Sequence, residues 1–126
     1  MNSPTRALAL TSPPHVPAPG DPRWSDWLTR EELAFSYGLQ RAHEHLSARK
    51  AAKEAVAQLL GLPLGPGTWH AMEVRRRPGA APTMEFHGVL ADHLRSLQLP
   101  FPAVSLTHAK GHAAALAWLP VRRAEP

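Results

Sequence analysis

The chain has 126 residues, 44% of them hydrophobic, which suits one small domain with a core and excludes a disordered tail. It contains no Cys, which excludes disulfides, thiolate zinc sites and cysteine nucleophiles. The apolar stretches are too short for a membrane helix, the first ten residues lack a secretory pattern, and the net charge of +4 favours anionic partners. We therefore expect a cytoplasmic protein that does not bind membranes.

The first 24 residues are rich in proline, with six of the fourteen prolines of the chain. Proline fixes φ and removes a backbone donor, so only residues 6–11 are predicted to form a short strand. The residues up to Pro22 are predicted to be an extended connector. This gives a division into an N-terminal strand and connector over 1–24, a domain over 25–121 and a frayed tail over 122–126.

Two helices are predicted next. Thr29-Arg-Glu-Glu32 places a hydroxyl and a carboxylate three residues apart, which is the capping-box pattern of a helix start. That helix is predicted to end at Gly38. A second helix is predicted over 41–60, where small and apolar residues recur at helical spacing before Gly61 ends it.

The remaining elements are mainly strands. Residues 68–77 and 83–87 are predicted to be strands joined by a loop, and 89–97 a short helix. Residues 102–107 and 112–119 are apolar runs of strand length. The expected fold class is α+β, with helices packed on a mainly antiparallel sheet.

The second helix carries a basic face around one carboxylate. Arg49 and Lys53 are neighbours at i,i+4, as are Lys50 and Glu54. Nearby cations keep a carboxylate ionised, so Glu54 could hold a divalent metal while the basic residues bind phosphates. The alternative is a solvated helix face with ordinary ion pairs.

A second polar group ends the fourth predicted strand. The segment Val104-Ser-Leu-Thr-His108 is followed by Lys110 and Gly111. His108 could bind a phosphate or act as an acid or base, because imidazole titrates near neutral pH. The alternative is a purely structural histidine.

Taken together and in order, these segments resemble the holo-acyl-carrier-protein synthase type of 4′-phosphopantetheinyl transferase. The signature helix of that family resembles Arg49-Lys-Ala-Ala-Lys-Glu-Ala55, and its final strands resemble Val104-Ser-Leu-Thr-His108 with Ala113-Ala-Ala115. Trp69 with Glu73-Val74, and Gly79 to Gly88, resemble the intervening strand and hairpin. The likeness covers roughly residues 28–119.

The resemblance implies the 4′-phosphopantetheinyl transferase fold and a definite activity. The expected reaction transfers the phosphopantetheine arm of coenzyme A to a serine of an apo acyl carrier protein in fatty-acid or polyketide biosynthesis, with Mg²⁺ at the diphosphate. The resemblance makes Glu54 the magnesium ligand. It makes Glu54, Lys53 and His108 catalytic, and it places at coenzyme A the residues Arg49, Lys53, Ser105, Thr107, His108 and Lys110. It also implies a homotrimer.

The chain departs from the family pattern at functional positions. The family's first strand reads Gly-x-Asp, whose Asp is a metal ligand, and here that place falls at Thr11 or Ser12. A loop could bring back Asp21 or Asp26. The family's aromatic residue before Ala-Ala-Lys-Glu is Lys50 here, and many members have a lysine where this chain has Gln58.

These departures leave an alternative function open. The chain could be a degenerate scaffold of the same fold without transferase activity, acting as an accessory or differently catalytic protein on a carrier-bound or free polyketide intermediate. Nucleic-acid binding is not expected, since it would depend only on the net charge and on Arg75-Arg-Arg77.

Overall fold

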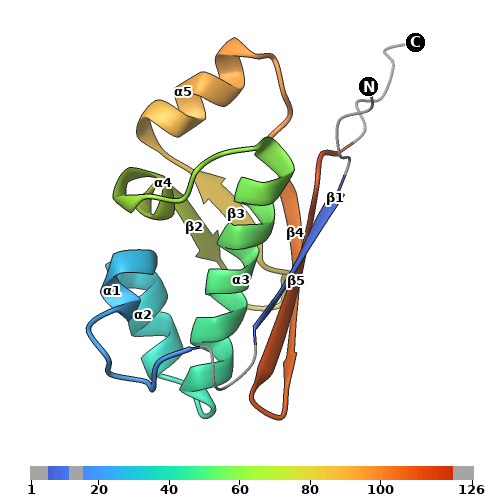
Figure 1. The fold of residues 1–126 in the computed structure, drawn as a ribbon. Helices are drawn as coiled ribbons and strands as arrows, with labels where there is room; N and C mark the ends of the chain where they lie inside the picture. The colour runs from blue at the N-terminus through green and yellow to red at the C-terminus, as the bar shows by residue number, and fades with distance from the viewer. Residues whose placement is uncertain (1–5, 12–15, 121–126) are drawn as a thin grey trace.

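The computed structural model describes residues 6–11 and 16–120. One long helix, α3 (Ala42–Leu60), runs through the centre of the molecule. A three-stranded sheet lies on one side of α3 and the shorter helices lie mostly on the other (Figure 1). The helix begins and ends close to the predicted 41–60, and Gly61 ends it with a left-handed φ of 67°.

The sheet is antiparallel and joins the two ends of the described chain. It consists of β1 (Arg6–Thr11), β4 (Ala103–Ala109) and β5 (His112–Trp118), in the order β1-β5-β4. β1 therefore belongs to the same packed unit as the domain predicted over 25–121. Residues 12–15 of the predicted connector and the tail predicted over 122–126 lie outside the described residues.

Small residues let the sheet approach α3 closely. Ala113, Ala115 and Ala117 of β5 are buried against the helix and alternate with side chains that point away from it. On α3, Ala51, Ala52, Ala55 and Val56 are buried, and they share one core cluster with Ala115 and Ala117. No described helix covers the other face of the sheet (Figure 1).

Two short helices precede α3. They are α1 (Trp24–Trp27), which was not predicted, and α2 (Arg30–Tyr37). The predicted capping box is confirmed, because the Thr29 hydroxyl accepts the Glu32 N–H and the Glu32 carboxylate accepts the Thr29 N–H. Gly38 ends α2, as predicted.

The strand predicted over 68–77 is wrong in its first half. Residues Pro66–His70 form a short helix, α4, and only Met72–Arg75 form the strand β2. Pro66 stands in the first turn of α4, where its missing N–H costs nothing. β2 pairs with β3 (Thr83–Phe86), and α5 (Gly88–Ser96) follows.

The α+β fold class predicted from the sequence is confirmed. Within residues 6–11 and 16–120, no helix combines the length and the apolar character needed to cross a bilayer.

Candidate functional site

A small cavity next to the N-terminal half of α3 collects four cationic or titratable side chains. It measures about 190 Å³, and the polar residues that line it are His45, Arg49, Arg76 and His108. Pro82, in the β2–β3 connection, also lines the cavity. The cavity lining contains no carboxylate. Two guanidinium groups and two imidazoles without an acid suit an anion, and phosphate above all.

Arg49 is the buried cation of this cavity. The residue is 4% exposed, and its guanidinium carbon lies 4.4 Å from the centre of the Phe35 ring. Nη1 donates to the carbonyl oxygen of His45 at 3.4 Å, whereas Nε is buried and has no partner among the described residues. Burial lowers the pKa of Arg49 from its usual high range. A buried guanidinium with an unused donor is costly unless a ligand pairs with it.

Glu44 holds the β4–β5 turn against the start of α3. Its carboxylate accepts the Gly111 N–H at 2.8 Å, and its second oxygen lies 3.2 Å from Nδ1 of His108. The hydrogen bond from Gly111, with a smaller contribution from His108, keeps the pKa of Glu44 below its ordinary value. The contact fixes the orientation of His108 at the cavity.

His45 packs directly against His108. The two ring centres are 4.5 Å apart, at an interplanar angle of 62°. Burial lowers the pKa of His45, and the positive charges of His108, Arg49 and Arg76 lower it further. Bound phosphate would counter that repulsion, so anion binding and proton uptake by His45 favour each other.

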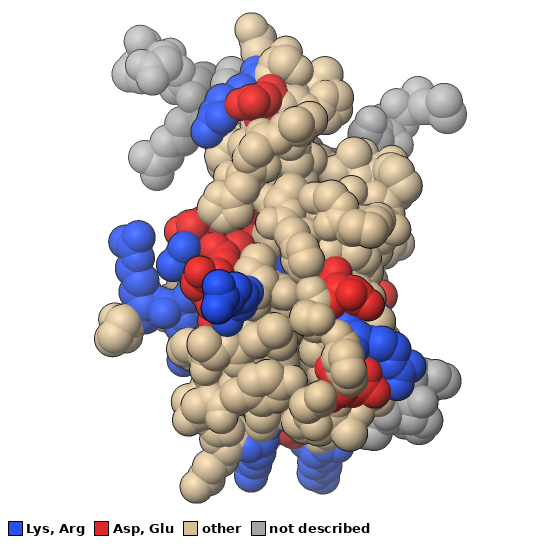
Figure 2. Space-filling model, turned by 90° about the vertical axis from the view of Figure 1, so that its left-hand side faces the viewer, with Lys and Arg blue, Asp and Glu red and all other residues tan. Residues whose placement is uncertain are grey.

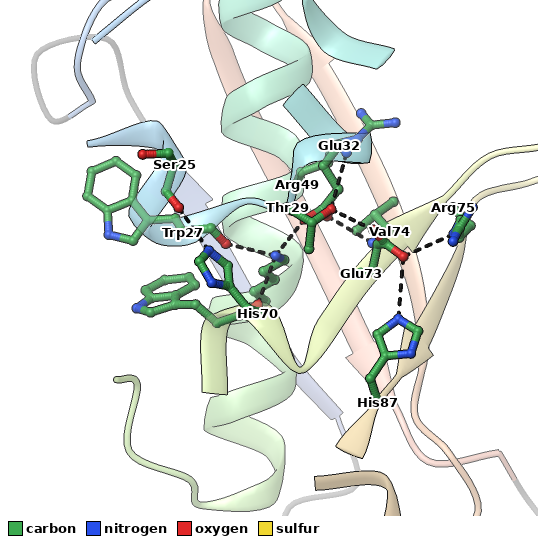
Figure 3. Close-up of polar contacts among 12 residues, drawn as sticks. Ser25, Trp27, Thr29, Glu32, Arg49, His70, Glu73, Val74, Arg75 and His87 are labelled. Carbon is green, nitrogen blue, oxygen red and sulfur yellow. Dashed lines mark hydrogen bonds and ion pairs between the residues drawn. The ribbon is translucent and has the colours of Figure 1, made fainter. Parts of the chain in front are cut away.

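Lys53 lies elsewhere and is fully buried. Its ammonium nitrogen donates to Glu32 Oε1 at 2.6 Å and to the carbonyl oxygens of Trp27 and Trp69 at 2.7 and 2.9 Å (Figure 3). Three acceptors satisfy all three ammonium hydrogens. Burial lowers the pKa of Lys53, although Glu32 opposes this shift. In this structure the predicted catalytic lysine therefore faces the protein interior and binds α3 to its neighbours, with no donor left for coenzyme A.

The polar network continues from Glu32 toward β2. Glu32 Oε2 accepts the Val74 N–H at 2.8 Å, and the Thr29 hydroxyl donates to Glu73. Glu73 also contacts Nε of Arg75 at 3.1 Å and Nε2 of His87 at 3.3 Å (Figure 3). These contacts connect α2, α3 and the β2–β3 hairpin, which indicates a structural role.

Glu54 is separate from the cationic cavity. It follows Arg49 by five residues, which places it about 7.5 Å along the helix axis and about 140° around it. Its Oε2 lies 3.4 Å from Nζ of Lys50. Its Oε1 is buried, and no described residue bonds to it. One carboxylate oxygen is thus available to a metal ion, which prefers such oxygen ligands.

The other predicted binding residues are scattered. Ser105 and Thr107 are exposed on β4, at alternating positions to His108. By that alternation they point to the uncovered face of the sheet, away from the cavity. Lys110 is exposed in the β4–β5 turn with a φ of 53°. Of the predicted set, the structure brings Arg49 and His108 into one cavity and leaves Ser105, Thr107 and Lys110 outside its lining.

Acidic groups do not gather around Glu54 in the described part of the chain. Among the described residues, the group of three possible metal ligands that lie within reach of one another is Glu73, Glu85 and His87, on the β2–β3 side. Nε of Arg75 already pairs with Glu73 and Glu85 at 3.1 and 3.2 Å. Asp21 pairs with Arg23 at 2.9 Å, which occupies one of the two acids considered as a replacement ligand.

Charge and cavity size alone do not single out the site. On the face that carries α1 and α4, basic and acidic side chains lie next to each other in mixed clusters (Figure 2). A larger cavity of about 740 Å³ lies between residues 62–71 and 87–93, but Leu62, Leu64, Val89 and Leu90 line much of it and neither Lys nor Arg does. The smaller cavity is the better anion site because its charges are concentrated.

Sequence reasoning missed the parts played by Arg76 and Glu44. Arg76 belongs to the run Arg75-Arg-Arg77, which was considered from the sequence only for nucleic-acid binding, and the β2–β3 connection brings it to the cavity. The Glu44 contact with the β4–β5 turn joins residues 64 to 67 positions apart, which no local pattern reveals. His45, at i,i+4 before Arg49, carried a usable signal.

Comparison with known proteins gives a consistent result. No family model matches the chain. The protein called holo-[acyl-carrier-protein] synthase in Koribacter versatilis is 38% identical over 88 residues, which cover 69% of this chain and 70% of that protein. The protein of the same name in Shewanella putrefaciens is 32% identical over 102 residues, which cover 80% of each chain.

Solved structures agree on the fold. The holo-[acyl-carrier-protein] synthase of Neisseria meningitidis superposes with a TM-score of 0.79 at 17% identity, covering 93% of this chain and 98% of that one. The acyl carrier protein synthase of Mycobacterium tuberculosis gives 0.67 at 27% identity, covering 94% and 97%. The suspected resemblance is confirmed, and the chain belongs to the holo-[acyl-carrier-protein] synthase family.

Proposed function

We propose that the chain transfers the 4′-phosphopantetheine arm of coenzyme A to a serine of an apo acyl carrier protein. In this reaction the serine oxygen bonds to the phosphorus of the arm, the bond from that phosphorus to 3′,5′-ADP breaks, and the serine proton is released. Membership of the family supports this activity over the degenerate-scaffold alternative. Structure neighbours from Bacillus anthracis and Helicobacter pylori were solved in complex with coenzyme A.

The observation that carries the proposal is the buried Arg49 guanidinium in a cavity without carboxylates. Its free Nε, with Arg76, His45 and His108 around it, would bind phosphates of coenzyme A. The small volume suits a phosphate group and part of a nucleotide, with the rest of coenzyme A lying outside. Glu44 would hold His108 in place for this contact.

Glu54 is the residue that would hold magnesium. Its buried, unpartnered Oε1 fits a divalent cation, and diphosphate oxygens and water would supply the remaining ligands. When bound, magnesium neutralises charge on the diphosphate and makes its phosphorus easier to attack. Glu54 would help to hold the diphosphate in this way, so its charge is expected to be essential.

A homotrimer is part of the proposal because one protomer does not bring the parts together. Arg49 and Glu54 leave α3 on different sides, so coenzyme A bound at Arg49 would meet a Glu54 supplied by another copy. The uncovered face of the sheet offers an apolar contact, since Leu8 and Leu10 are 56% and 71% exposed beside Leu116. A cytoplasmic location and a fatty-acid or polyketide carrier also stay predictions.

The test is incubation with coenzyme A, magnesium and several apo carrier proteins, followed by intact-mass spectrometry. We expect a carrier to gain the phosphopantetheine mass. Glu54→Gln should nearly abolish the gain, and the matched control Glu31→Gln, on exposed α2 surface, should not. If no carrier is modified while an active synthase modifies them in parallel, the transferase proposal is wrong.

A further inference from the structure

Lys50 and Lys53 lie three residues apart on α3 and have opposite surroundings. Lys53 is fully buried and donates to three protein acceptors. Lys50 keeps 15% of its side chain exposed, and Glu54 is its ion-pair partner among the described residues, at 3.4 Å. An ammonium group has three donors, so Lys50 retains donors for a ligand.

Two indole rings hold the Lys50 ammonium beside Glu54. Nζ lies 4.7 Å from the centre of the Trp27 ring and 5.6 Å from that of Trp69. Both distances are within the range of cation–π attraction. The two rings are 6.3 Å apart and tilted by 51°, so they form two walls of one cage.

The cage is fixed to the same helix that carries its cation. Lys53 binds the backbone carbonyl oxygens of both Trp27 and Trp69, and its own charge is balanced by Glu32. The tryptophans therefore cannot move away from α3 without breaking buried hydrogen bonds. A long lysine side chain normally samples many rotamers, and this arrangement restricts Lys50 to the neighbourhood of Glu54.

The result is a fixed cation at a carboxylate that is poor in other partners. Glu54 Oε1 is buried without a hydrogen bond from any described residue. Glu54 is also not a member of the group of possible metal ligands formed by Glu73, Glu85 and His87. One helical turn further, Gln58 is exposed and neutral. Positive charge next to Glu54 thus comes from Lys50 within the described part of the chain.

We propose that Lys50 is the resident cation of the Glu54 site, where it neutralises Glu54 and donates hydrogen bonds to the diphosphate of coenzyme A. Binding of coenzyme A therefore depends less on a divalent ion. The inference rests on the proposed function, because it assigns coenzyme A to this site. Lys50 is a binding residue in this scheme, and Trp27, Trp69 and Lys53 are positioning residues.

The experiment measures coenzyme A binding by calorimetry on the full chain, once in millimolar magnesium and once in EDTA. The affinity of the unmodified protein for coenzyme A in EDTA should be within about tenfold of its affinity in magnesium, because Lys50 already supplies a cation. A tenfold difference in affinity corresponds to about 1.4 kcal/mol. Lys50→Met should bind at least about tenfold more weakly than the unmodified protein in EDTA. Magnesium should restore most of that loss.

Two controls separate charge from fold. Lys50→Arg keeps a cation that stacks on aromatic rings and should behave like the unmodified protein. Arg95→Met removes an exposed cation of α5, paired with Asp92, and should leave both affinities unchanged. Thermal unfolding of each variant checks that Met at position 50 has not disrupted the domain.

The outcomes distinguish the two proposals. If coenzyme A binds the unmodified protein only in magnesium, or if Lys50→Met binds equally well in EDTA, the Lys50 inference is overturned and the transferase proposal stands. If the unmodified protein binds coenzyme A in neither buffer and modifies no carrier, both are overturned. Rescue by Lys50→Arg together with the loss in Lys50→Met supports the inference.

Discussion

Lys53→Met is expected to be among the most destabilising single substitutions in this domain, although the position was predicted to be catalytic. Methionine has a similar length but no charge, so it would leave the fully buried Glu32 carboxylate without its cation. The carbonyl oxygens of Trp27 and Trp69 would also lose their shared donor. Unpaired buried groups of this kind are the main source of large mutational losses.

The size of the loss follows from burial. Neither side chain of the pair is exposed, and removing one partner of a buried ion pair typically costs about 3–5 kcal/mol. Domains of this size are stable by about 5–15 kcal/mol, so the variant would lose a large part of its stability. Burial lowers the pKa of Lys53 and Glu32 opposes this shift, so the ion pair supports the charged form of the lysine.

Urea unfolding followed by circular dichroism measures the effect. A double-mutant cycle with Glu32→Gln should recover part of the loss, because Gln removes the unpaired charge and still offers an acceptor to the N–H of Val74. Lys50→Met, at a partly exposed lysine of the same helix, is the matched control and should cost about 1 kcal/mol. A loss below about 1 kcal/mol in Lys53→Met would refute a structural role for this lysine.

The remaining predictions concern the cavity, the turn and the sheet. Arg76→Ala should weaken binding of 3′,5′-ADP by about tenfold in calorimetry while the unfolding midpoint stays unchanged, because one exposed charge–phosphate contact is lost; an unchanged affinity would remove Arg76 from the site. Glu44 has a pKa below its ordinary value in the folded state. Its contribution to the free energy of unfolding is therefore complete when the pH is above that ordinary pKa, and it is lost as the pH falls through the lower pKa of the folded state. Glu44→Gln should therefore flatten the acid side of the stability profile, and an unchanged profile would contradict the contact with Gly111. Leu10→Glu should shift the protein from trimer to monomer in sedimentation velocity, whereas a trimer that persists would place the interface elsewhere.

Local patterns predicted most of the secondary structure because its signals lie close together in sequence. The capping box at Thr29, the glycine stop at Gly61 and the alanine periodicity of α3 all act within a few residues. Pro66 also signals a helix start, a signal that the prediction of a strand from residue 68 did not use. A five-residue helix has too little periodicity to correct that choice.

The site was only partly predictable because its key contacts join distant segments. Periodicity places Arg49 and Lys53 on one face of α3, and nothing local indicates that Glu32 of α2 covers Lys53 while Arg49 stays open to a cavity. The same limit applies to Lys50. A substituted aromatic position suggests lost packing, whereas the fold places Trp27 and Trp69 around the new charge.

The pairing of β1 with β5 has a consequence for how the protein is made. Arg6 lies opposite Trp118, so the first described strand finds its partner only after the residues up to Trp118 have left the ribosome. Until then Leu8 and Leu10 have no neighbouring strand, and closing so long a loop is slow compared with forming α3. Biogenesis of this protein should therefore end in a late docking event, and a nascent chain stalled before β5 should be a substrate for chaperones and proteases.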